Sequence, residues 1–165
     1  MPMKSSTLSS MVVATLMALP ASSAFAEKAA DTVKKEEKAK WSVNAPQGEF
    51  TKAAIDVRSG TWMNVDISPD GKTVVFDLLG DIYTMPVKGG KATPLMTDIA
   101  WQMQPRFSPD GKYIAYTSDE NGGDNLWIMN TDGTNSKPVT KETFRLLNSP
   151  AWSPDSKTLT YITVT

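Results

Sequence analysis

Carboxylates are the side chains best suited to chemistry in this 165-residue chain, because it contains neither histidine nor cysteine. That composition excludes Ser-His-Asp triads, Cys-His dyads and zinc sites built on His or Cys within the chain. Asp66, Asp77 and Asp81 could form an acid and base pair, since paired carboxyl groups hydrolyse glycosidic bonds. The distances in space between these carboxyl groups cannot be read from their positions in the sequence. Asp81 also stands where a strand is expected to begin. We therefore favour structural roles and predict no catalytic residue and no cofactor in this chain.

An acidic, glycine-containing segment at 119–125 (DENGGDN) is a candidate metal site. Asp119, Glu120, Asn121 and Asp124 carry the hard oxygen ligands that calcium prefers. Their spacing does not follow the EF-hand pattern, and the composition is equally typical of a solvated hairpin loop. We favour the loop interpretation, with calcium as the weaker alternative.

Four tryptophans could line a ligand cavity: Trp62, Trp101, Trp127 and Trp152. They recur at related but unequal intervals. Large aromatic side chains more often fill the wedge between packed sheets, so that role is favoured for these four.

An internal repeat determines how these residues are positioned. The motifs are ISPDGK at 67–72, FSPDGK at 107–112 and WSPDSK at 152–157, so their serines recur after 40 and 45 residues. Serine, proline, aspartate and then glycine describe a type I turn whose glycine is left-handed, and such a turn joins two antiparallel strands. Ser156 replaces that glycine in the third copy, which predicts the weakest turn of the three.

Four short strands are expected in each full repeat. In the first repeat they cover 64–67, 73–79, 81–87 and 92–97, and the last contains Pro94, which suits an outermost edge strand. Pro138 has the same place in the second repeat. Four strands per 40 to 45 residues is the period of a β-propeller. We predict an all-β, partial propeller of about two and a half four-stranded blades over 51–165, with blade one at 60–100, blade two at 101–144 and an incomplete blade three at 145–165.

The N-terminus has the pattern of an export signal. Lys4 precedes an apolar run at 11–19 that is too short to cross a bilayer, and Ala24, Phe25 and Ala26 form a cleavage site before Glu27. We predict a signal peptide at 1–26, no stable membrane span, and a periplasmic or secreted protein. The charged and alanine-rich segment that follows indicates a flexible tether at 27–50.

Charge argues against nucleic acid as a partner. Removal of Lys4 with the signal leaves 16 basic and 18 acidic side chains, so the mature chain has no excess positive charge for a polyanion.

The repeats resemble the TolB-like, WD-related propeller blades of exported bacterial proteins. The region from Gly60 to Asp155 is similar to the propeller that precedes a metal-dependent amidohydrolase domain in large secreted hydrolases. This similarity rests on DLLGDIY at 77–83, QPRFSPDG at 104–111, DNLWIM at 124–129 and FRLLN at 144–148.

The resemblance implies a non-catalytic propeller segment of an exported amidohydrolase-family hydrolase, used for packing, binding or substrate access. The family's catalytic histidines have no counterpart here, so a metal ion is expected only in a downstream hydrolase domain. A free-standing periplasmic propeller that binds a protein or peptide is the alternative. Because propellers commonly close with four to eight blades, we interpret the chain as a truncated member. Its open blade faces predict association with the hydrolase domain, an envelope protein or another copy.

Overall fold

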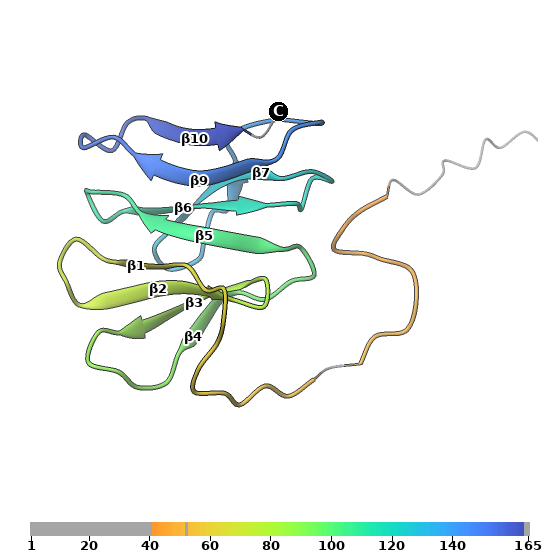
Figure 1. Ribbon diagram of the computed structural model, residues 1–165, viewed down its shortest axis with the longest axis horizontal. Coiled ribbons are helices and arrows are strands. Elements are labelled where there is room, and N and C mark those ends of the chain that lie inside the picture. The colour runs from red at the N-terminus through yellow and green to blue at the C-terminus, as the bar shows by residue number, and fades with distance from the viewer. Residues whose placement is uncertain (1–40, 52, 164–165) are drawn as a thin grey trace, which may run out of the picture. The chain divides into compact units, whose positions relative to one another are not determined.

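Ten strands and no helix are formed by the residues that the computed structural model describes, 41–51 and 53–163. They make antiparallel sheets with the orders β1-β2-β3-β4, β5-β6-β7-β8 and β9-β10 (Figure 1). The strands are β1 (Val65–Ile67), β2 (Thr73–Leu78), β3 (Asp81–Pro86), β4 (Thr93–Met96), β5 (Gln102–Phe107), β6 (Tyr113–Ser118), β7 (Asn125–Asn130), β8 (Lys137–Pro138), β9 (Leu147–Trp152) and β10 (Leu159–Thr163). The predicted all-β fold of two four-stranded blades and part of a third is confirmed.

The Ser-Pro-Asp turns have the predicted geometry. Gly71 and Gly111 have φ of 70° and 71°, and Ser156 has φ of 60°, so all three lie in the left-handed region. In the first turn the Ser68 hydroxyl donates to Asp70 Oδ1 at 2.6 Å and accepts from the Thr73 N–H at 2.9 Å. The same two bonds recur in the other turns, which explains why serine and aspartate stand two residues apart in every copy.

Proline marks the sheet edges, as predicted. Pro94 lies in β4 and Pro138 in β8, and each of these strands pairs on one side only. A proline has no N–H to contribute to a ladder, so an edge strand accommodates it at little cost.

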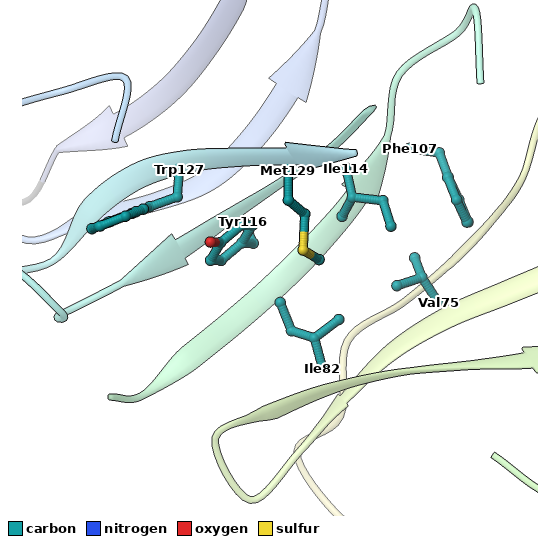
Figure 2. Packing of buried hydrophobic residues seen from close by; sticks show 7 residues of the cluster. All are labelled: Val75, Ile82, Phe107, Ile114, Tyr116, Trp127 and Met129. Atoms are coloured by element: carbon teal, nitrogen blue, oxygen red, sulfur yellow. The ribbon is translucent and has the colours of Figure 1, made fainter. Parts of the chain in front are cut away.

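The main core lies between the first two blades (Figure 2). Strand β5 packs on β1, β2 and β3, while β9 packs on β5, β6 and β7. We call the side of a blade that faces the following blade its back face, and the side that faces the preceding blade its front face. The core cluster joins the back face of blade 1, through Val75 and Ile82, to the front face of blade 2, through Phe107, Ile114, Tyr116, Trp127 and Met129. Burial of such side chains stabilises a fold by about 1.5–3 kcal/mol each.

The N-terminal predictions fall mostly outside the described residues. The signal peptide at 1–26 lies there entirely, as does the tether up to residue 40. Within the described part of the tether, Asn44 Oδ1 accepts the N–H groups of Ile99 at 3.1 Å and Ala100 at 2.8 Å, so this segment contacts the connection between blades 1 and 2. No helix within the described residues is long and apolar enough to cross a membrane.

Candidate functional site: the interfaces between blades

Asp77 holds the first two blades together through its carboxylate. The residue is only 4% exposed, at the back face of blade 1. Oδ1 accepts the backbone N–H of Asn64 at 2.7 Å, while Oδ2 accepts the Asn64 side-chain amide at 2.8 Å and the Gln104 backbone N–H at 2.7 Å. Asn64 and Gln104 are equivalent residues of the two repeats. One side chain therefore fixes the same backbone position in two successive blades.

Asp66 makes a similar pair of contacts, to the N–H groups that lie three residues after those of Asn64 and Gln104. Its Oδ1 accepts the Ile67 N–H at 2.9 Å, and its Oδ2 accepts the Phe107 N–H at 2.8 Å. Ile67 and Phe107 are again equivalent residues of successive repeats. Hydrogen bonds to a charged acceptor contribute about 1.5–3 kcal/mol each, so these carboxylates stabilise the interface. We refer to Asp66 and Asp77 as the carboxylate clamps.

The interface between blades 2 and 3 lacks such clamps. Arg106 and Thr117 occupy the positions equivalent to Asp66 and Asp77, and the Thr117 hydroxyl donates to its own blade at Met103 O, 3.2 Å away. Instead, Gln104 Oε1 accepts the Ser149 N–H, and Trp152 Nε1 donates to Arg106 O at 3.1 Å. Neutral acceptors therefore take the place of carboxylates there.

Asp81, the third candidate of the catalytic pair, begins β3 and shares no hydrogen-bond partner with the clamps. Its Oδ2 accepts the Tyr83 hydroxyl at 3.1 Å. Burial raises the pKa of Asp81, and the nearby Asp98 carboxylate raises it further. The three carboxylates thus have separate surroundings, and the two clamps accept backbone N–H groups.

The candidate calcium segment forms the loop between β6 and β7. Asp119 Oδ1 accepts the Trp101 N–H at 2.8 Å, which attaches this loop to the start of blade 2. Burial raises the pKa of Glu120 and of Asp124, with added repulsion from Asp98 and Asp119 respectively. Asn121 is exposed. Among the described residues, no three His, Cys, Asp or Glu side chains are grouped so as to hold a metal ion. Calcium binding here stays a prediction, and the weaker one.

Asn125 is a functional residue of the fold that sequence reasoning missed. It is 2% exposed at the start of β7. Its Oδ1 accepts the Thr140 hydroxyl at 2.8 Å and the Glu142 N–H at 2.7 Å, and its Nδ2 donates to Gly123 O and Glu142 O, each at 3.0 Å. The side chain thereby fixes the connection toward blade 3. The available sequence signal was an Asn directly before an apolar strand.

The tryptophans divide between the two roles considered. Trp127 is 5% exposed and stacks on Tyr116 with ring centroids 6.5 Å apart, so it fills the wedge between blades. By contrast, Trp62 and Trp101 line a hollow of about 350 Å³ together with Asp77 and Met103. Trp101 lies against Gly80, where a Cβ would come within 2.7 Å of the indole ring and where φ is 88°. Only glycine fits there without strain.

Comparison with known proteins agrees with this architecture. The model of the TolB beta propeller domain matches residues 20–165. The chain belongs to this family. Among relatives of this TolB-type chain, a Sulfurisphaera tokodaii protein assigned as a Tricorn-like protease C-terminal subunit is 29% identical over 100 residues, which are 61% of the chain and 11% of the relative. The chain spans 8% of another, the Tricorn protease homolog 1 of Streptomyces coelicolor, and is 29% identical to it over 91 residues.

A solved structure shows the same blades. A protein of Agrobacterium tumefaciens assigned as TolB superposes with a TM-score of 0.58 and 25% identity, covering 65% of this TolB-type chain and 40% of the other. The chain thus spans less than half of that propeller protein and about a tenth of the curated relatives named above.

Proposed function

We propose that these blades are the non-catalytic propeller segment of an exported amidohydrolase-family hydrolase. The segment packs against the hydrolase domain, binds a partner or controls substrate access. The observation that carries this proposal is the use of the carboxylates: Asp66 and Asp77 accept backbone N–H groups and hold blades together. The proposal is supported by the sequence strings that resemble amidohydrolase propellers, and by relatives named as proteases of which the chain spans a small part.

Assays of the purified chain test the non-catalytic role. We expect no amidase, esterase, peptidase or glycosidase turnover, with or without added zinc, because the chain has no imidazole or thiol. Asp66→Asn, Asp77→Asn and Asp81→Asn are the matched variants. Turnover that survives purification and disappears in one of these variants would overturn the proposal.

The open reading frame that contains these residues tests the hydrolase context. A frame that continues past Thr165 into a His-x-His-containing domain supports it, and zinc-dependent hydrolysis by the complete gene product would extend it to activity. A frame without such a domain would instead favour a free-standing periplasmic propeller with a protein or peptide partner. Similarity to the Agrobacterium structure assigned as TolB is the observation on which this second candidate rests.

Export to the periplasm is part of the same proposal. Intact-mass measurement of periplasmic material should give a mature N-terminus at Glu27. An N-terminus at Met1 or Met3 would contradict the signal peptide.

A further inference from the structure

The hollow between blades 1 and 2 combines one carboxylate with two accessible indole rings. Its volume of about 350 Å³ lies within the range of about 300–1,000 Å³ that is usual for ligand sites. Its walls come from the bend before β1, the turn between β2 and β3, and the start of β5. Among the described residues that line it, Asp77 is the only charged one.

Asp77 is a buried anion whose hydrogen bonds all come from neutral groups. Its three donors are the backbone N–H and side-chain amide of Asn64 and the backbone N–H of Gln104. Both ion pairs of the described residues form in Ser-Pro-Asp turns and do not involve Asp77. Buried charges are normally paired with an opposite charge. Because a carboxylate oxygen has two lone pairs and Oδ1 accepts one hydrogen bond, Oδ1 can accept another.

Trp101 presents one side of its indole ring. A Cβ on Gly80 would come within 2.7–3.2 Å of three atoms of that ring, so the ring lies directly against the Gly80 backbone. The residue is nevertheless 49% exposed, which leaves the other side of the ring accessible. Its backbone N–H is bonded to the Asp119 carboxylate at 2.8 Å, and this places a second negative charge beside the same residue.

Trp62 provides a second indole on a bend that is fixed to blade 1. Gly60 lies so close to Leu78 that a Cβ there would come within 2.8 Å of the leucine side chain, and Asn64 is bonded to Asp77. Trp62 itself is 98% exposed, and its φ of 61° is unusual for a bulky residue. The bend therefore presents an accessible aromatic ring beside the buried carboxylate.

We infer that this hollow binds the guanidinium group of an arginine side chain from a peptide or protein partner. Indole faces attract cations, and the planar guanidinium stacks on them. Guanidinium N–H groups also donate to carboxylates, so the ligand provides Asp77 with a counter-charge and a donor for Oδ1. A lysine ammonium is more strongly hydrated and does not stack in this way. The inference specifies a ligand that neither candidate function specifies, and it is independent of the hydrolase context.

Nuclear magnetic resonance of the full chain tests the inference through its five indole N–H signals, assigned with single Trp→Phe variants. The probe is the blocked tripeptide acetyl-Gly-Arg-Gly-amide. Its titration should shift the signals of Trp62 and Trp101 saturably. The signals of Trp127, which is 5% exposed, and of Trp152, whose Nε1 donates to Arg106 O, should move little.

Peptides that differ only in the central side chain separate charge from shape. Citrulline has nearly the shape of arginine without its charge, so its peptide should bind at least about tenfold more weakly. The lysine peptide should bind at least about threefold more weakly than the arginine peptide. Equal affinity for the citrulline or the lysine peptide would overturn the guanidinium assignment. This comparison leaves Asp77 unchanged, which matters because Asp77 also joins the blades.

Variants of the walls locate the site. Trp62→Ala and Trp101→Ala should each weaken binding of the arginine peptide at least about threefold, because each removes one indole face. Phe144→Ala is the matched control: Phe144 is 92% exposed, does not line the hollow, and its loss should leave the affinity unchanged. Absence of saturable shifts at Trp62 and Trp101 in wild type, or wild-type affinity in both tryptophan variants, would overturn the inference.

Discussion

The two blade interfaces of this chain fix equivalent backbone positions by different means. Between blades 1 and 2, buried Asp77 accepts the Gln104 N–H, and between blades 2 and 3 the neutral Gln104 side chain accepts the Ser149 N–H. Gln104 and Ser149 have similar left-handed backbone, with φ of 57° and 55°. The left-handed residue presents its N–H toward the preceding blade in both cases. The backbone conformation thus fixes which N–H group donates, whereas the side chain that accepts this hydrogen bond differs between the repeats.

This difference predicts that the two blade interfaces stabilise the chain to different extents. Carboxylate acceptors form stronger hydrogen bonds than amides do, and the first interface also contains the seven-residue core of Figure 2. We therefore expect the first interface to stabilise the chain more than the second, and the β9-β10 pair to open first.

Loss of the buried clamp should have the largest effect. Asp77→Ala leaves the backbone N–H groups of Asn64 and Gln104 without their acceptor, and is expected to lower the free energy of unfolding by about 3 kcal/mol or more. Urea unfolding followed by tryptophan fluorescence at one fixed protein concentration measures it. Thr117→Ala, the matched change in blade 2, should cost about 1 kcal/mol. Equal losses in the two variants would contradict the ranking of the interfaces.

Loss of the amide acceptor at the second interface should have a smaller and more local effect. Gln104→Ala removes the acceptor of the Ser149 N–H, at an expected cost of about 1 kcal/mol. Native-state hydrogen exchange should show faster exchange in β9 and β10, with protection of β2 and β3 unchanged. Uniformly faster exchange in all blades would show that the second interface supports the first.

Substitution of Ser156 tests a turn that also contributes to the second interface. Its left-handed backbone favours glycine by about 1 kcal/mol, but its Oγ accepts the Asp110 N–H of the neighbouring blade at 3.0 Å. The exposed hydrogen bond offsets part of the gain, so Ser156→Gly should stabilise the chain by about 0.5 kcal/mol. Ser156→Ala keeps the backbone strain and loses the bond, and should be less stable than wild type. A glycine variant less stable than wild type would mean that the hydrogen bond outweighs the strain.

The smallest expected effect is a pH dependence of the free energy of unfolding. It arises from one carboxyl group at the start of β3 and two in the loop between β6 and β7. Burial raises the pKa values of Asp81, Glu120 and Asp124. A carboxyl whose pKa is raised by folding is more easily protonated in the folded state, so its contribution favours folding at low pH and is lost as pH rises through the raised pKa. The urea midpoint should therefore rise slightly as pH falls from 7 toward the ordinary carboxyl values of 3.8 and 4.5.

The triple variant Asp81→Asn, Glu120→Gln and Asp124→Asn should flatten that rise. The turn carboxylates, exemplified by Asp70 and Asp110, set the opposite trend at lower pH. Hydrogen bonds from Ser68 and Ser108 lower their pKa values, so their contribution is present at neutral pH and lost as pH falls below the ordinary value near 3.8. A midpoint that falls steadily from pH 7 would contradict the role of the raised groups.

The repeat, its turns and its edge strands follow from local sequence patterns. The serine and aspartate of each turn bond within two to five residues, and Pro94 and Pro138 mark the outer strands through their own missing N–H. Such local chemistry predicts both hairpin positions and blade order. It also predicted the left-handed, glycine-like conformation of Ser156, which its φ of 60° confirms.

Which side chains join the blades depends on contacts between residues far apart in the sequence. Asp77 reaches an N–H 27 residues away and Asp66 one 41 residues away, and nothing in the local pattern distinguishes these carboxylates from solvated ones. The same holds for the tryptophans: Trp127 is buried between packed blades, whereas Trp62 lies in a bend before β1 and is exposed. Burial in a propeller is a property of neighbouring blades, so it follows from how the repeats stack and not from the composition of any one of them.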